Sequence, residues 1–140
     1  MTQVDFYILN TTQTEQFACI LVEKVFKQGH KIHIHTTDNV QTERMDNLLW
    51  TYSDQSFLPH VVMGDALQAD TPINVSHDQD NALISDVLVN LRPDIPLFYR
   101  QFTRVAELVS ANPQHRQAAR IRYREYQQQG CKVVSHEINR

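Results

Sequence analysis

The stretch that decides the fold is residues 4–50, VDFYILNTTQTEQFACILVEKVFKQGHKIHIHTTDNVQTERMDNLLW. Residues 4–9 are short, aromatic and branched, which predicts a buried strand. Apolar residues then recur at helical spacing until Gly29, which predicts a helix. Thr12 and Glu15 at its start predict a capping box. Residues 31–36 predict a second strand, and 40–50 a second helix capped near Asp38. Two strand–helix units with short joints indicate a parallel sheet.

The rest of the chain continues this α/β alternation. Short strands are expected at residues 73–75, 86–91, 104–109 and 132–138, and one or two helical turns at 97–102. Residues 51–71 show no strong periodicity. At 140 residues, without repeats or a linker, the chain predicts a single domain spanning 1–140. The expected fold is a three-layer α/β/α domain with a mostly parallel central sheet.

Composition and charge narrow the possible environments and partners. No apolar run is long enough to span a membrane, and the N-terminus lacks a signal-peptide pattern. Two isolated cysteines, Cys19 and Cys131, are typical of reduced thiols, so we expect a cytoplasmic protein. Residues 1–103 hold 6 Lys/Arg against 13 Asp/Glu, whereas residues 104–140 hold 7 against 3. A basic pole on an acidic body suits an acidic protein segment better than a nucleic-acid track.

That basic pole centres on residues 112–130, NPQHRQAARIRYREYQQQG. Asn112 as N-cap, Pro113 at the first helical position and Gly130 as the stop predict one helix. Arg122 falls on the side of this helix that is expected to face the core, where an ion pair with a carboxylate from the sheet is expected. The other basic residues form a stripe that is either solvated surface or a site for an acidic ligand with an apolar end. This stripe consists of Arg116, Arg120, Tyr123 and Gln127, with Arg124 beside it.

Nucleotide and metal chemistry have little support. The turn after the first strand, residues 10–14, contains no glycine, whereas a phosphate cradle needs the close backbone approach that glycine allows. The strand–turn–helix opening is typical of a nucleotide-binding-like fold, and this turn predicts that the fold lacks a phosphate loop. His33 and His35 share one side of their strand, as metal ligands or as structural histidines, and no third ligand is evident. No serine or cysteine lies in a nucleophile motif, so no catalytic residue, cofactor or metal is predicted.

A second candidate surface lies around the end of the second predicted helix. Trp50 closes that helix, and Phe57, Leu58 and Pro59 follow in a polar loop. Aromatic side chains on irregular backbone often anchor a partner, because they dominate the energetics of interfaces. The alternative is that Trp50 and Phe57 fold inward and cover the sheet.

Taken in order, these segments resemble the chi subunit of bacterial DNA polymerase III holoenzyme over nearly the whole chain. The resemblance rests on the segments FYIL (6–9), LLW (48–50), SFLPH (56–60), DVLVNL (86–91) and ARIRYREY (119–126). It implies a three-layer α/β fold and a non-catalytic accessory subunit in DNA replication. The alternative is a small nucleotide- or metal-dependent enzyme on a Rossmann-like fold.

The resemblance also implies partners. Chi pairs with the psi subunit, and through it joins the clamp loader. It also holds the acidic C-terminal tail of the single-stranded DNA-binding protein, which ends in a phenylalanine carboxylate. A monomer that forms a heterodimer with psi is implied, without strong direct binding to nucleic acid. The family's tail pocket corresponds to Val109, Arg116, Arg120 and Tyr123, with Arg124 nearby; its psi-facing surface, which a repair helicase also uses in some members, corresponds to Trp50, Phe57, Leu58 and Pro59.

Overall fold

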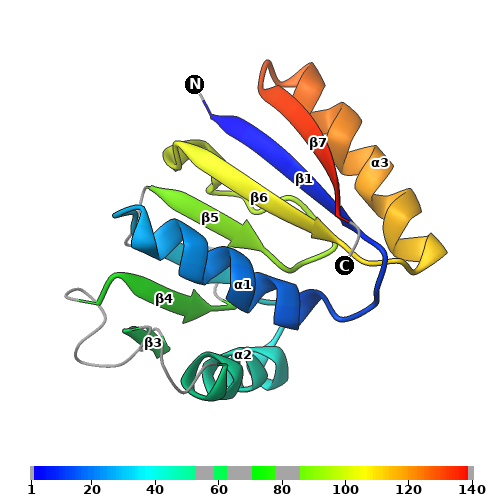
Figure 1. The fold of residues 1–140 in the computed structure, drawn as a ribbon. Coiled ribbons are helices and arrows are strands. Elements are labelled where there is room, and N and C mark those ends of the chain that lie inside the picture. Colours follow the sequence, from blue (N-terminus) through cyan, green and yellow to red (C-terminus); the bar gives the residue numbers. More distant parts are fainter. Residues whose placement is uncertain (1, 53–58, 63–70, 78–85, 139–140) are drawn as a thin grey trace.

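The computed structural model describes residues 2–52, 59–62, 71–77 and 86–138. Three helices, seven strands and a short 3-10 helix are found in this part of the chain (Figure 1). The strands are β1 (Gln3–Leu9), β2 (Ile32–His35), β3 (His60–Val62), β4 (Ile73–Ser76), β5 (Val87–Asn90), β6 (Arg104–Val109) and β7 (Lys132–Ile138). The helices are α1 (Thr14–Lys27), α2 (Asn39–Thr51) and α3 (Pro113–Gln128), with the 3-10 helix at Tyr99–Gln101.

The strands form one sheet in the order β3-β4-β2-β5-β6-β1-β7. Every neighbouring pair is parallel, so the sheet is more uniform than the mostly parallel one expected. The first strand, β1, lies between β6 and β7, far along the sheet from β2. The predicted α/β class is confirmed, including the strands at 73–75, 86–91, 104–109 and 132–138.

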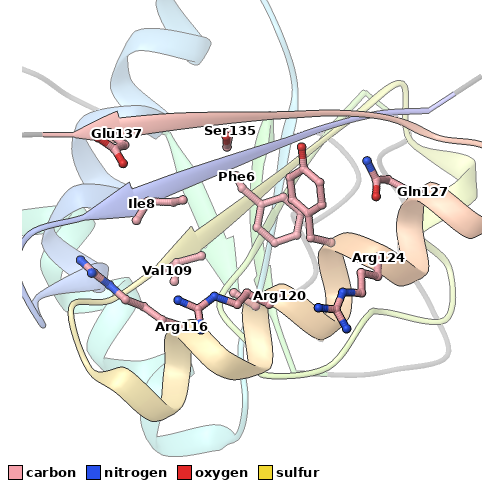
Figure 2. Close-up of a pocket in the computed structure, with 11 residues that line it drawn as sticks. Phe6, Ile8, Val109, Arg116, Arg120, Arg124, Gln127, Ser135 and Glu137 are labelled. Atoms are coloured by element: carbon pink, nitrogen blue, oxygen red, sulfur yellow. The ribbon is translucent and has the colours of Figure 1, made fainter.

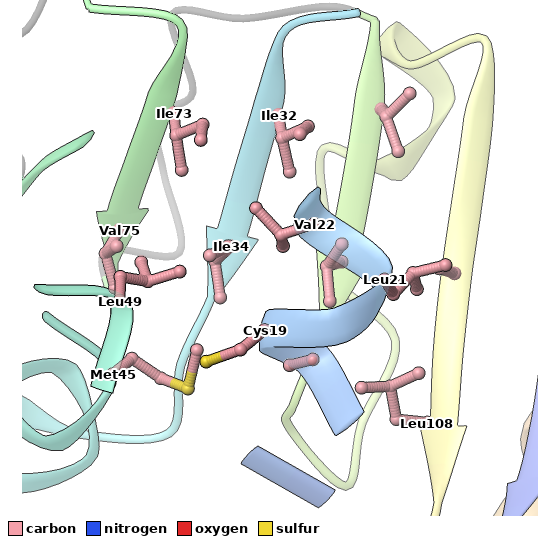
Figure 3. Close-up of a cluster of buried hydrophobic side chains, with 14 residues drawn as sticks. Cys19, Leu21, Val22, Ile32, Ile34, Met45, Leu49, Ile73, Val75 and Leu108 are labelled. Atoms are coloured by element: carbon pink, nitrogen blue, oxygen red, sulfur yellow. The ribbon is translucent and has the colours of Figure 1, made fainter. Parts of the chain in front are cut away.

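Helices cover both faces of the sheet and make the three layers. On one face, apolar residues of α1 and α2 pack on the central strands, as Figure 3 shows for Val22, Leu49 and Ile34. On the other face, α3 packs against β1 and β6 around the buried ring of Tyr126. The sheet is thus buried on both sides, as is usual for an all-parallel sheet.

The ends of α3 follow directly from its sequence. The Asn112 side chain accepts hydrogen bonds from the backbone N–H groups of Gln114 and His115, and Pro113 occupies the first turn. Beyond the other end, Gly130 has a φ of 87°, a left-handed conformation that favours glycine. The predicted caps of α3 are confirmed. So is the N-cap of α2, where the Asp38 carboxylate accepts from the Gln41 N–H.

Two expectations for the local structure were wrong. Helix α1 begins at Thr14 and has no side-chain cap, so Thr12 and Glu15 do not form a capping box. Glu15 instead forms two hydrogen bonds with Arg44 of α2, because a bidentate guanidinium pair binds a carboxylate more strongly than a helix-end N–H does. The second miss is β3, which was not predicted within residues 51–71. At three residues it is too short to show an apolar period.

Candidate functional site

The basic stripe of α3 borders a cavity of about 480 Å³ between that helix and the sheet (Figure 2). The residues of the stripe predicted from helical spacing lie together, and every one of them lines this cavity. Its apolar base combines the Tyr123 ring of α3 with side chains of the sheet, because the strands beneath α3 direct alternate side chains toward it. The lining residues are Phe6, Ile8, Val109, Arg116, Ala119, Arg120, Tyr123, Arg124, Gln127, Ser135 and Glu137.

The base of the cavity is aromatic and aliphatic. Val109 is buried at the end of β6, only 2% exposed, and Ile8 of β1 is its partner in the sheet register. The Tyr123 ring lies against the Phe6 ring, with centroids 5.2 Å apart and planes tilted by 48°. These side chains form a surface on which an apolar group of a ligand can pack.

The arginines of the cavity differ in how they are held. An Nη atom of Arg116 donates to the Leu9 carbonyl oxygen over 3.0 Å, and its buried Nε makes no hydrogen bond within the described residues. Arg120 and Arg124 are exposed, and neither forms an ion pair or hydrogen bond with any described residue. Guanidinium groups that are not neutralised are available for a carboxylate.

A buried polar network connects α3 to β6 and to the carbonyl of Pro93. Arg122 donates from Nε to Glu107 Oε1 over 3.1 Å and from Nη1 to the Pro93 carbonyl over 2.7 Å. The other Glu107 oxygen accepts from the Tyr126 hydroxyl at 2.7 Å and from Asn90 Nδ2 at 2.8 Å. The ion pair expected for Arg122 is confirmed, with its partner on β6. Full burial raises the pKa of Glu107 despite the neighbouring Arg122.

Sequence reasoning missed the sheet residues that complete the cavity. Phe6 and Ile8 project from β1 toward α3, whereas Ser135 and Glu137 do so from β7 (Figure 2). The β1 residues could have been found from the alternation of their strand. The β7 residues could not, because no local signal places the last strand beside the first.

The second candidate surface is described only in part. Trp50 is 54% exposed at the end of α2, and its ring lies 4.5 Å from that of His60 between centroids. Pro59 is half-buried. Phe57 and Leu58 lie outside the described residues. The inward-folded alternative for Trp50 is therefore wrong, since more than half of this side chain faces solvent.

His33 and His35 belong to a buried aromatic cluster. Both are fully buried, their rings are 6.1 Å apart, and Phe98 packs edge-on against each. Within the described residues, no group of three His, Cys, Asp or Glu side chains is placed to hold a metal. Both cysteines are free thiols, and Cys19 is buried.

The turn from β1 to α1 contains no residue with positive φ. Among the described residues, only Gly29 and Gly130 have positive φ, and neither is in this turn. At the same edge of the sheet, Arg92 Nη1 donates to the carbonyl oxygens of Thr36 and Thr37 while its Nε binds Asp94.

None of the described helices is both long and apolar enough to cross a membrane.

The fold and cavity define a three-layer α/β protein with nucleotide-binding-like architecture and an arginine-lined cavity under its last helix. A family model described as "DNA polymerase III chi subunit, HolC" matches residues 1–134. The chain is 35% identical to the DNA polymerase III subunit chi of Pseudomonas aeruginosa, covering 100% of this chain and 99% of that protein. It is 31% identical to the same subunit of Haemophilus influenzae (95% of each) and 28% to that of Escherichia coli (93% and 94%). The chain therefore belongs to the DNA polymerase III chi subunit family, whose members take part in DNA replication.

Proposed function

We propose that this protein is a non-catalytic adaptor in DNA replication that joins the clamp loader, through psi, to the C-terminal tail of the single-stranded DNA-binding protein. The observation that carries the proposal is the cavity under α3, which combines available guanidinium groups with an apolar base. An acidic peptide that ends in a phenylalanine has the complementary chemistry.

In this proposal, the carboxylate and the phenyl ring of the ligand's last residue bind to different parts of the cavity. Arg120, with Arg124 nearby, holds the terminal carboxylate and the aspartates that precede it. The phenyl ring packs on Val109 and Tyr123, where it loses contact with water. The cavity is open and its charges are screened by salt, so we expect a salt-sensitive affinity of roughly micromolar strength, about 8 kcal/mol.

Binding of a labelled peptide, with several aspartates before a C-terminal phenylalanine, tests the tail site by fluorescence anisotropy. Arg120→Ala should weaken binding at least about tenfold, because a charge-assisted bond is lost. Arg100→Ala is the matched control. It removes an exposed arginine whose Nη2 binds the Gln129 carbonyl, outside the cavity. Equal affinities of the two variants would contradict the proposed site.

The psi-binding surface is proposed at Trp50, Phe57, Leu58 and Pro59. It is supported by the exposure of Trp50, since a large exposed aromatic side chain is a common interface anchor. A repair helicase is a further candidate for the same surface.

Co-purification with psi tests this surface separately from the tail site. Trp50→Ala should lose psi and retain the tail peptide. The control is Val40→Ala, at a residue of the same helix that is 61% exposed. If Trp50→Ala lost both partners, damage to the fold would be indicated, and retention of psi would contradict the proposed surface.

A further inference from the structure

One residue of the cavity has the wrong charge for an acidic ligand. Glu137 lies on β7, on the side of the cavity opposite α3 (Figure 2). In the sheet register, Ile8 pairs with Val109 on one side and with Glu137 on the other. Glu137 therefore lies in the same row of residues as the apolar base of the cavity, close to the carboxyl ends of the strands.

Arg116 is at this same end of the cavity, because it donates to the carbonyl of Leu9, the residue after Ile8. Arg120 and Arg124 follow one and two turns further along α3, where Tyr123 contacts Phe6, two residues before Ile8 on β1. Glu137 is exposed and forms no ion pair within 4.0 Å with any described residue. No described residue therefore neutralises its negative charge by direct pairing, and this charge acts on the contents of the cavity.

Building on the function proposed above, we propose that Glu137 is a specificity-determining residue that makes the cavity bind acidic peptides that end in an apolar residue in preference to polyanions that lack one. Three arginines alone would attract any strongly acidic segment. A carboxylate at the Arg116 end repels each additional acidic group that reaches it, whereas a ligand anchored by its apolar residue and one carboxylate near Arg120 avoids most of that repulsion. Selectivity thus arises from a repulsive group beside the attractive ones.

The two ligands to compare are the labelled peptide ending in phenylalanine and an unlabelled oligo-aspartate used as competitor. Glu137→Gln should tighten the peptide about threefold and the oligo-aspartate about tenfold, so that discrimination between them falls. The control is Glu43→Gln, which removes the same charge from an exposed residue of α2, outside the cavity. It should change either affinity by less than about twofold, because α2 lies on the opposite face of the sheet from α3 and salt screens charges that far from the ligand.

A charge-compensation experiment tests the location of the effect. Arg116→Gln should weaken peptide binding, and adding Glu137→Gln should restore most of it, whereas adding Glu43→Gln should not. Thermal melts should establish that each variant is folded. The inference is overturned if Glu137→Gln and Glu43→Gln behave alike, or if both ligands tighten equally. If Arg120→Ala has no effect on the peptide, the proposed function itself fails; if only the Glu137 results fail, the proposed function stands.

Discussion

The two faces of the sheet are stabilised in different ways. On the α1/α2 face, the buried cluster is almost entirely aliphatic, with Cys19 and Met45 as its sulfur-containing members (Figure 3). On the α3 face, the core surrounds a fully buried carboxylate, Glu107, that binds Arg122 and Tyr126. Aliphatic packing holds a helix near a sheet but tolerates small shifts, whereas hydrogen bonds fix direction.

This difference coincides with the location of the candidate site. The arginines of the cavity are on α3, so its rotation decides which side chains reach the cavity and which face solvent. Arg122 and Tyr126 are one turn apart on the buried side, and both bind the same residue of β6. We infer that the buried network keeps Arg120 and Tyr123 directed toward the cavity, at the cost of placing an ion pair in the core.

The largest expected effect follows from breaking that ion pair. Arg122→Met should lower the free energy of unfolding by about 3–5 kcal/mol, because it leaves Glu107 buried without its cationic partner. Combining Glu107→Leu with Arg122→Met should cost less than Arg122→Met alone, since no unpaired charge remains. Urea denaturation measures both.

The same variants test whether the network positions the cavity. In the double variant, binding of the acidic peptide should be weaker even where stability is recovered, because the rotation of α3 is no longer fixed. If peptide affinity followed stability in both variants, the proposed positioning role would be wrong and the network would only stabilise the fold.

A smaller loss of stability is expected on the aliphatic face. Leu49 of α2 is 1% exposed, and Leu49→Ala should lower the free energy of unfolding by about 2–4 kcal/mol through lost burial and the cavity that remains. Peptide affinity at a temperature where the variant is folded should be unchanged, since α2 lies on the opposite face of the sheet from α3. A weakened peptide site would show that the two faces are coupled.

Much of the fold could be predicted from local sequence. The spacing of apolar residues identified most strands. The ends of α2 and α3 were predictable because Asp38, Asn112 and Gly130 act within their own turns. Helical spacing also predicted that Arg122 lies on the side of α3 that faces the core. What could not be predicted depends on strand order: Glu107 as the partner of Arg122, and Ser135 and Glu137 as cavity residues. Those contacts join segments far apart in the chain, and no local pattern encodes them.

The failed capping box at Thr12 shows the same limit on a smaller scale. Locally, Glu15 is well placed to cap the start of α1, but Arg44 of α2 binds it through Nε at 3.0 Å and Nη2 at 2.7 Å. Packing of two helices against one face of the sheet brought these residues together. A tertiary contact therefore replaced the local one that the sequence favoured.

Breaking the Glu15–Arg44 pair should have the smallest effect on the free energy of unfolding, and this effect should depend on pH. The hydrogen bonds from Arg44 lower the pKa of Glu15, with burial opposing them. The folded state thus holds the Glu15 proton less tightly than the unfolded state, so the pair stabilises the fold above the ordinary glutamate pKa and ceases to do so as pH falls through the lowered value. Arg44 is 56% exposed, which screens the attraction, and Glu15→Gln should cost under about 1 kcal/mol at pH 7. Urea denaturation at pH 7 and pH 3 should show the difference between wild type and Glu15→Gln shrinking at the lower pH. A difference that grew instead would mean that Glu15 is held by something other than Arg44, and the packing of α1 against α2 would need another explanation.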